Sequence, residues 1–255
     1  MGLALFPQRG LARTPANALC NIHAGAKIGR SGYNELNTKH ETRSHLQLSF
    51  FTNLGLGVQI QERLITQNTR EEIHRATQSL LSQTKPADVV AALFFAHPTI
   101  TAAFPAEGAR AVGWGQTPLL CIQDQELPPS GLRIVLLRAP AGTQWVGLRG
   151  ANTAKTPTKE AFLALCTALL QQNPSLPTSA RGMITTVTSD LEPFSPQESL
   201  RELGWSRCIS SHGFELNVPS LPKVVRVFVL METLEPARHV FLGETVQLRP
   251  DLLGK

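Results

Sequence analysis

The sequence has no long apolar run. A helix that crosses a membrane needs about 20 consecutive apolar residues, and the stretch "DVVAALFFA" at 88–96 is much shorter. We interpret this stretch as a buried strand and expect no interaction with membranes.

Cysteine is scarce, with four residues in a chain of 255. Their spacing contains no CxxC pair and matches neither a zinc site nor a disulfide framework, so we expect no metal ion. Cys121 lies in an apolar run and Cys166 on the apolar stripe of an expected helix. We expect both thiols to be reduced, which favours a reducing compartment.

Acidic residues are missing from the first 34 positions. The net charge is +5, but residues 1–50 hold six basic and two acidic side chains, whereas the remaining residues hold 18 and 17. Because nucleic-acid binding needs a basic face on the folded part, we expect no nucleic-acid partner. Residues 1–55 are interpreted as an N-terminal extension: a transit peptide for an organelle, a disordered segment, or upstream sequence translated from a misplaced start. We expect a cytoplasmic location unless residues 1–50 are a transit peptide.

One phrase occurs twice in the chain. "FPAEGARAVGW" at 104–114 returns as "SPQESLRELGW" at 195–205, 91 residues later. In each copy a proline begins a short helix, an arginine follows, and Gly-Trp ends it. Apolar periodicity predicts longer helices at 68–83 and 156–173, which correspond at an offset of 89 residues. Repetition of this kind indicates duplicated modules.

Both longer helices carry start signals. Asn68 followed by Glu71 matches a capping box. Thr156 followed by Pro157 is typical of an N-cap and a first helical residue. These signals predict where the two helices begin.

Strand-like runs follow these helices in both copies. They lie at 88–95, 118–123 and 131–137 in the first copy, and at 182–188, 207–211 and 224–232 in the second. An alternating run at 239–248 adds a last strand, for which the first copy has no counterpart. The sequence thus predicts an α+β fold of two tandem β-α-β-α-β-β modules, at 56–140 and 145–255, with mixed sheets and helices packed on them. Since each module is short for an independent domain, we expect the two to pack edge to edge or face to face.

Three phrases carry a resemblance to a known family. "GLRGANTAKTPTKEAF" at 147–162, "TAAFPAEGARAVGWGQTPLLCIQ" at 101–123 and "RHVFLGETVQLRPDL" at 238–252 resemble AroH-type chorismate mutases. The resemblance implies an isomerase without metal or cofactor, which converts chorismate to prephenate in the shikimate pathway of aromatic amino-acid biosynthesis. The family is typically a trimer of single modules with each site formed between neighbours, so we expect this chain to form a homo-oligomer.

The chemistry of this reaction explains which side chains such a site needs. Chorismate is a dicarboxylate, which arginines hold with paired hydrogen bonds. Its Claisen rearrangement needs no acid, base or nucleophile, but negative charge develops on the ether oxygen, where a fixed cation stabilises the transition state. A carboxylate can bind the ring hydroxyl and offset positive charge on the ring.

The second copy matches one half of the family site. The resemblance assigns the catalytic roles to Arg149 in "GLRGA", Glu215 in "FELNV" and Arg226 in "VVRVFV". Arg226 is expected at the ether oxygen, and an arginine inside so apolar a strand is costly to bury without a partner. The substrate-binding positions of this copy are Phe241, Arg249, Ser211 and His212. Phe241 replaces the usual tyrosine, so one hydrogen bond to the substrate is expected to be lost, and Ser211-His212 replaces Thr-Cys.

The first copy matches the opposite half. The resemblance assigns substrate binding to Phe104, Ala106 and Arg110 in "FPAEGAR". Glu107 stands where some relatives have a lysine. For the other half-site this copy is poor: Ile60 and Gln61 occupy the place of the first-strand arginine, although Asp124 and Arg133 match the glutamate and the second arginine. The second copy has in turn replaced Phe-Pro-Ala by Ser-Pro-Gln at 195–197.

The losses in the two copies are complementary. We therefore expect one composite site, within a chain or between chains, that joins Arg149, Glu215 and Arg226 to Phe104 and Arg110. Decay of a duplicated gene without a surviving site is the competing explanation. The alternative functions are a non-catalytic binding or regulatory relative and a different enzyme acting on chorismate.

Other prominent residues have simpler interpretations. Trp114 and Trp205 follow a glycine at a helix end, and we expect both to anchor the core. His97 and His212 are expected to serve as structural polar residues, because the reaction needs no base.

Overall fold

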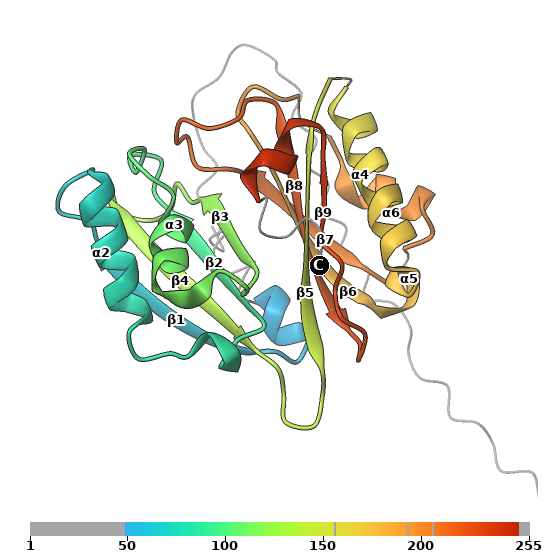
Figure 1. The fold of residues 1–255 in the computed structure, drawn as a ribbon, viewed down its shortest axis with the longest axis horizontal. Helices are drawn as coiled ribbons and strands as arrows, with labels where there is room; N and C mark the ends of the chain where they lie inside the picture. The colour runs from blue at the N-terminus through green and yellow to red at the C-terminus, as the bar shows by residue number, and fades with distance from the viewer. Residues whose placement is uncertain (1–48, 156, 193, 206, 250–255) are drawn as a thin grey trace, which may run out of the picture. The chain divides into compact units, whose positions relative to one another are not determined.

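The computed structural model describes residues 49–249 except 156, 193 and 206. The chain divides into two units, Met1–Lys39 and His40–Lys255, and every described residue belongs to the second (Figure 1). The expected extension up to residue 48, with its proposed transit peptide, lies outside the described residues, as does Thr156. Within the described ranges, no helix combines the length and the apolar character that a membrane span requires.

The first sheet is mixed and follows the order β1-β4-β2-β3. Strand β4 is antiparallel to β1 and β2, and β3 runs parallel to β2 at the edge. Helices α2 and α3 cover one face of this sheet (Figure 1). The elements are β1 (Gly57–Leu64), α2 (Arg70–Leu81), η1 (Pro86–Asp88), β2 (Ala91–Ala96), α3 (Pro105–Ala109), η2 (Arg110–Trp114), β3 (Leu119–Gln123) and β4 (Gly131–Arg138).

The second sheet follows the order β7-β6-β8-β5-β9. Strand β8 is antiparallel to β5 and β6, whereas β7 and β9 pair in parallel at the two edges. The elements are β5 (Trp145–Thr153), α4 (Thr158–Gln172), α5 (Leu176–Ser179), β6 (Ala180–Val187), α6 (Pro196–Glu202), β7 (Ile209–Phe214), β8 (Val224–Glu232), β9 (Val240–Leu242) and η3 (Gly243–Leu248).

The two sheets repeat one topology. Read from the other edge, the second sheet runs β5-β8-β6-β7 and so matches β1-β4-β2-β3, strand for strand. Strand β9 is the addition, and nothing pairs with the outer edge of β1 among the residues that the structure describes. The predicted α+β fold with two tandem modules is confirmed.

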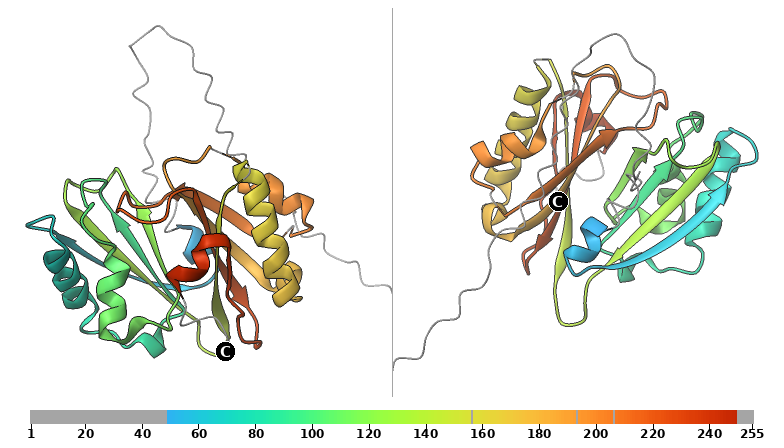
Figure 2. Two further views of the ribbon diagram at one scale, coloured as in Figure 1. Left: turned by 45° about the horizontal axis from the view of Figure 1, so that its top comes forward. Right: turned by 180° about the vertical axis from the view of Figure 1, so that it is seen from behind.

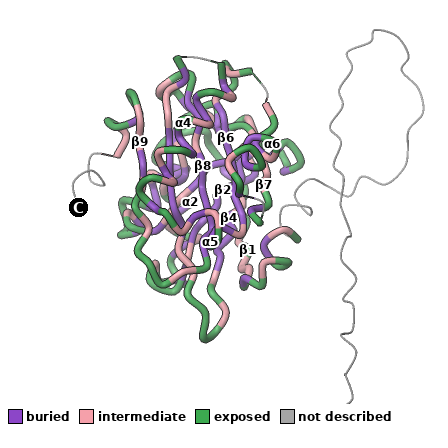
Figure 3. The backbone as a smooth tube through the Cα atoms, turned by 90° about the vertical axis from the view of Figure 1, so that its right-hand side faces the viewer, coloured by how far each residue is buried: buried purple, intermediate pink, exposed green. Residues whose placement is uncertain are grey.

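The sheets pack face to face, with their helices on the outer faces (Figure 2). One hydrophobic cluster joins Leu93 and Phe95 of the first sheet to Ile184, Phe228 and Leu230 of the second. The inner strands are accordingly buried (Figure 3). Burial of apolar surface from both modules fixes their relative position.

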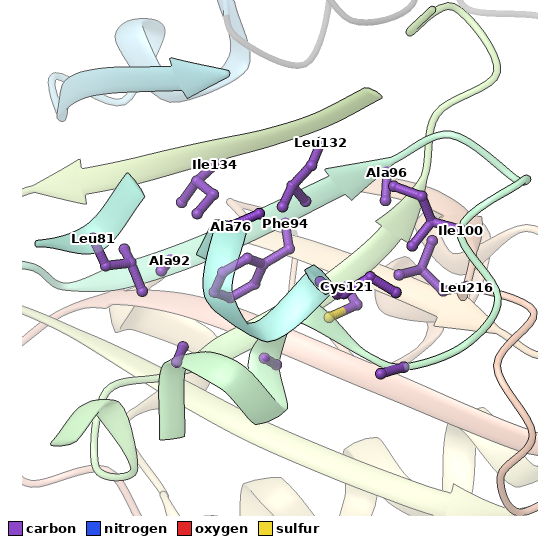
Figure 4. Close-up of a cluster of buried hydrophobic side chains, with 14 of the residues drawn as sticks. Ala76, Leu81, Ala92, Phe94, Ala96, Ile100, Cys121, Leu132, Ile134 and Leu216 are labelled. Carbon is purple, nitrogen blue, oxygen red and sulfur yellow. The ribbon is translucent and has the colours of Figure 1, made fainter. Parts of the chain in front are cut away.

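A second apolar contact brings the modules together beside helix α3. Leu216 and Val218, which follow β7, lie in the hydrophobic cluster beneath α2 and α3. Figure 4 shows Leu216 in this cluster with Ile100 and Cys121. The segment that carries Glu215 is therefore held against the first module.

Residues 49–56 contribute to the core, although we assigned most of them to the extension. Residues 49–53 are helical, Phe51 and Leu56 are buried, and Phe50 and Leu54 pack on the cluster between the sheets. A Cβ atom on Gly182 of β6 would lie 2.7 Å from the Phe50 ring. The glycine thus makes room for this N-terminal segment against the second sheet.

The repeated Gly-Trp pair has a structural cause. Gly113 and Gly204 adopt φ angles of +92° and +76°, a conformation that favours glycine. After α6, Gly204 N–H donates to Arg201 O and Trp205 N–H to Leu200 O, which closes the helix end. Trp114 and Trp205 then enter the core and are buried, as expected.

The start of helix α2 differs from the prediction by one residue. Thr69, not Asn68, is the N-cap, and its hydroxyl accepts a hydrogen bond from Glu72 N–H. The Asn68 carboxamide instead accepts from Thr101 N–H and Ala102 N–H, and donates to the Thr101 hydroxyl. A tertiary contact with the loop before Phe104 has displaced the local cap.

The last strand is much shorter than the predicted 239–248. Pairing ends at Leu242, because Gly243 takes a φ of +58° and a short 3-10 helix follows. The Thr153 hydroxyl accepts from Glu244 N–H, and the Thr245 hydroxyl donates to Ala151 O. These contacts with β5 turn the chain despite its alternating apolar pattern.

Candidate active site

The centre of the candidate site is an ion pair between Glu215 and Arg226. Arg226 is the third residue of β8, opposite Ala151 on β5 and Thr186 on β6. Glu215 directly follows β7, and its N–H donates to Val187 O at 2.9 Å. The Glu215 side chain is 6% exposed and that of Arg226 18%. The end of the edge strand β7 and the inner strand β8 thus bring the predicted carboxylate and cation together.

Burial dominates the electrostatics of Glu215. It raises the pKa of this carboxyl to about 7, against the opposing effect of the Arg226 charge. A carboxylate in this position is costly to desolvate, so the group titrates near neutral pH. A cavity of about 200 Å³ opens beside it, lined by residues 188–190 and 215–222.

Arg149 lies on β5 and is buried, with 6% exposure. Its Nη1 donates to Thr117 O of the first module at 3.4 Å. Its Nη2 lies 3.1 Å from His239 Nε2, and its backbone N–H donates to His239 Nδ1 at 3.2 Å. The side chain therefore points from the second sheet towards the segment before β3.

Helix α3 presents the first module's half of the site. Pro105 is its first residue and Phe104 its N-cap, and the hydrogen bonds from Asn68 hold the preceding loop. Gly108 lets the helix approach α2 closely, since a Cβ atom there would lie 2.8 Å from His74 Cα. Ala106 is buried and Arg110 is exposed at the helix end.

The Cys121 thiol on β3 is influenced by charged groups of both modules. Burial raises the pKa of its thiol to about 12, with smaller effects from a hydrogen bond with the Ala106 backbone and from the charges of Glu215, Arg110 and Arg226. Charged groups from both modules therefore lie within electrostatic range of one thiol. These groups are Arg110 of the first module and Glu215 and Arg226 of the second, and Arg149 is not among them.

The C-terminal residues also reach the first module. Arg249 Nη2 donates to Gly115 O at 2.9 Å, and Thr117, two residues on, contacts Arg149. Phe241 pairs with Ala151 across β5 and β9. Segment 115–117 is thus contacted by two arginines of the second module.

Ser211 and His212 are less closely associated with the site. They are consecutive on β7, opposite Ile184 and Thr185, so their side chains point to opposite faces of the sheet. Ser211 shares its face with Gly213, where a Cβ atom would lie 3.3 Å from Ile122 of the first module. His212 points to the face that carries α4 and α6.

The corresponding cation of the first module is differently placed. Arg133 on β4 pairs with Glu62 of β1 and also lies 3.6 Å from Asp124. Two carboxylates thus neutralise Arg133, whereas Arg226 pairs with one. Ile60, in the place of the missing arginine, is 44% exposed. The cationic half-site that the first module would provide is therefore electrostatically unsuited to a dianion.

Sequence reasoning missed three contributors: Asn68, Thr117 and His239. The signal for His239 was present, since it lies in the phrase "RHVFLGE". Thr117 contributes only a backbone carbonyl, which the sequence cannot reveal.

Comparisons with known proteins give matches to one enzyme family. The family model for chorismate mutase type I matches residues 63–139 and 145–252. The chorismate mutase AroH of Thermus thermophilus is 39% identical over 115 residues, which cover 42% of this chain and 94% of the relative. That of Bacillus subtilis (strain 168) is 34% identical over 115 residues, covering 42% and 91%. A solved chorismate mutase from Clostridium thermocellum is 28% identical with a TM-score of 0.36, and the match covers 39% of this chain and 96% of the other.

Proposed function

The chain belongs to the chorismate mutase type I family, and we propose that it converts chorismate to prephenate at one composite site per chain. The reaction is an intramolecular Claisen rearrangement. It requires the enzyme to hold a dianion in a reactive conformation and to stabilise charge that develops during bond breaking.

Each residue of the composite site has a role that follows from this chemistry. Arg226 donates to the ether oxygen as the bond to it breaks. Glu215 accepts from the ring hydroxyl and offsets the positive charge of the ring. Arg149 holds a carboxylate, Arg110 completes the cationic surroundings from the other module, and Phe104 and Ala106 form the pocket wall.

The observation that carries the proposal is the contact of Arg149 Nη1 of the second module with Thr117 O of the first. Leu216, the residue after Glu215, packs in the hydrophobic cluster beneath α2 and α3, which supports the same pairing of half-sites within one chain. The charges of Arg110, Glu215 and Arg226 also act on the Cys121 thiol. Random decay of two copies would not be expected to leave these particular halves adjacent.

A single site per chain is favoured over two. A second site would take its cations from the first module and its wall from the second. There, Arg133 is already neutralised by Glu62 and Asp124, and no arginine stands at the place of Ile60 or Gln61. A dicarboxylate substrate would meet a net negative charge there. The first module therefore contributes its wall and helix arginine, and the second its catalytic cations.

The deciding experiment is an assay of the purified chain with chorismate, followed as chorismate loss and prephenate formation. We expect activity in the wild type and a loss of about 100-fold or more in Arg149→Ala and in Arg110→Ala. An active wild type with both variants unaffected would rule out the composite site. Binding of chorismate without turnover would indicate the non-catalytic relative, and a product other than prephenate would indicate another chorismate enzyme.

Further proposals concern the protein's organisation. We propose module limits of 56–140 and 145–255, a homo-oligomer, and a cytoplasmic location unless residues 1–50 direct the chain to an organelle. Phe241, Arg249 and Ser211 remain proposed substrate contacts, of which Arg249 has the best support through its bond to Gly115 O. The expectation for His212 is not kept, because its side chain points to the opposite face of the sheet.

A further inference from the structure

The ion pair between Glu215 and Arg226 spans the strand β6. The second sheet contains the order β7-β6-β8, in which Arg226 belongs to β8 and Glu215 directly follows β7. Their side chains therefore meet over β6. On that strand Thr186 is the register partner of Arg226, and the next residue, Val187, accepts the hydrogen bond from Glu215 N–H. Thr186 is thus the residue of β6 that lies beneath the ion pair.

The Thr186 side chain projects from the same face of the sheet as Arg226. Residues directly opposite each other on neighbouring strands share a face, and so do residues two positions apart on one strand. Ile184, two residues before Thr186, packs in the cluster between the sheets. Thr188, two residues after it, lines the cavity beside Glu215. Thr186 therefore lies where the core between the sheets meets the cavity of the candidate site.

The hydroxyl of Thr186 is buried without a hydrogen bond. The residue is 0% exposed, and its Oγ1 atom has no hydrogen-bond partner among the residues that the structure describes. Such a hydroxyl costs free energy. The fold itself does not need one, because the first module has Phe95 at this position, opposite Arg133. We therefore looked for its purpose in the reaction.

The proposed reaction changes the surroundings of the Glu215 carboxylate. In the structure Arg226 Nη1 donates to Glu215 Oε2. At the substrate, Arg226 has to donate to the ether oxygen, which draws its guanidinium away from the carboxylate. Glu215 is only 6% exposed, and a buried carboxylate that loses a partner is costly. A hydroxyl can donate to a carboxylate, and hydrogen bonds to charged acceptors are strong.

We propose that Thr186 is a positioning residue, whose hydroxyl donates to the Glu215 carboxylate when Arg226 turns to the substrate. This inference rests on the proposed function of the same site. The hydrogen bond compensates Glu215 for the weakened ion pair and holds it towards the ring hydroxyl. Because Arg226 is drawn most strongly to the ether oxygen as the bond breaks, this hydrogen bond stabilises the transition state more than the bound substrate. It therefore acts on kcat and not on KM.

Two substitutions of Thr186 separate this role from a structural one. Thr186→Val replaces the hydroxyl by a methyl group, and we expect kcat to fall roughly 10-fold while KM stays within about twofold. Its melting temperature should stay the same or rise, because the variant no longer buries an unpaired hydroxyl. Thr186→Ser keeps the hydroxyl but loses a buried methyl group. It should recover most of the kcat and melt at a lower temperature than the wild type.

Thr185→Val is the matched control. Thr185 precedes Thr186 on β6, is equally buried, and its hydroxyl also has no hydrogen bond within the described part of the chain. Its side chain points to the opposite face of the sheet, so its kcat and KM should stay within about twofold of the wild type. Equal kcat in Thr186→Val and the wild type, or equal losses in both Val variants, would overturn the inference and leave the proposed function intact.

A double-mutant cycle tests whether Thr186 acts through Glu215. In a Glu215→Gln background the carboxylate is absent, so adding Thr186→Val should lower kcat by less than about twofold, against roughly 10-fold in the wild-type background. The same factor in both backgrounds would contradict a role through Glu215. A wild type that neither converts chorismate nor binds prephenate would refute the proposed function and this inference together.

Discussion

Arg149 of the second module donates to the backbone carbonyl of Thr117 in the first module, with Nη1 and O 3.4 Å apart. The two residues are 32 positions apart in one chain and belong to different modules. Because Thr117 lies between η2 and β3, this contact orients the second module's arginine towards helix α3 of the same chain. This contact supports the proposed pairing of the two half-sites within one chain.

An intrachain site predicts that two defective chains do not rescue each other. Arg110→Ala removes a cation from the first module and Arg226→Ala one from the second, and each variant is expected to lose about 100-fold or more in kcat. A refolded equimolar mixture of the two variants should stay inactive. Mixing either variant with wild type should give half the activity and serves as the control. Recovery of about a quarter of wild-type activity in the mixture of variants would assign the site to neighbouring chains.

The equivalent arginines of the two modules should differ sharply in importance. Arg226→Ala should abolish most activity, since it removes the cation at the breaking ether bond. Arg133→Ala should retain kcat within about threefold, because Glu62 and Asp124 already neutralise the Arg133 charge and Arg133 is not part of the proposed site. The comparison is matched, as both arginines occupy corresponding strands, β8 and β4. Similar losses in both variants would point to two working sites per chain.

The raised pKa of Glu215 predicts a pH-dependent reaction rate. Its role requires the carboxylate, and a pKa of about 7 makes it about one tenth ionised at pH 6 and about nine tenths at pH 8. Consequently kcat/KM should rise through neutral pH and level off above about pH 8. Glu215→Gln should be slow, and its remaining activity should lack this inflection. A pH profile of the Gln variant that keeps the wild-type inflection would assign the titration to another group.

The raised pKa of Glu215 also makes the free energy of unfolding depend on pH, and here the effect decreases as the pH rises. The folded state binds the Glu215 proton more tightly than the unfolded chain, because burial raises the pKa from 4.5 to about 7. This contribution to the free energy of unfolding is complete below pH 4.5 and is lost as the pH rises through about 7. The free energy of unfolding of Glu215→Gln, measured by urea titration, should lack that decline.

The N-terminal segment 49–56 should be required for stability. Phe51 is 1% exposed within the cluster between the sheets, so Phe51→Ala should lower the free energy of unfolding by about 3–5 kcal/mol. Leu234→Ala is the control, because Leu234 is 80% exposed and its loss should matter by less than about 0.5 kcal/mol. Thermal or urea unfolding of both variants provides the comparison. Equal stabilities would mean that residues 49–56 are dispensable for the fold.

The sequence predicted the residues of the Glu215–Arg226 pair, but not the contacts around them. Arg226 and Glu215 could be found because each lies in a phrase with a family counterpart, and an arginine within an apolar strand needs a partner. The contact of His239 with Arg149 could not be found, because it depends on the parallel pairing of strands 90 residues apart. Chemistry-bearing residues are visible in the sequence, whereas the register that unites them is a tertiary property.

The errors in element boundaries have the same origin. Asn68 matches an N-cap, but its carboxamide bonds the loop at Thr101, which a local rule cannot anticipate. The alternating pattern of 239–248 predicts a strand, yet hydrogen bonds with Thr153 end it at Leu242. Residues 49–55 resembled an extension because their apolar partners, such as Ile184 and Phe228, come more than 100 positions later.

The last prediction concerns the acidic residue on helix α3. Glu107 pairs with Arg70 of α2, lies 3.6 Å from His74 Nε2, and precedes Arg110 by one helical turn. A carboxylate near a site for a dianion weakens binding, and Arg70 offsets that charge. Glu107→Gln should therefore lower KM by about two- to fivefold, and Arg70→Ala should raise it by a similar factor. Both effects should shrink between 0.05 and 0.5 M salt, because ions screen exposed charges. Shifts of the same sign in the two variants, or effects that ignore salt, would mean that packing between α2 and α3, and not charge, controls substrate affinity at this helix.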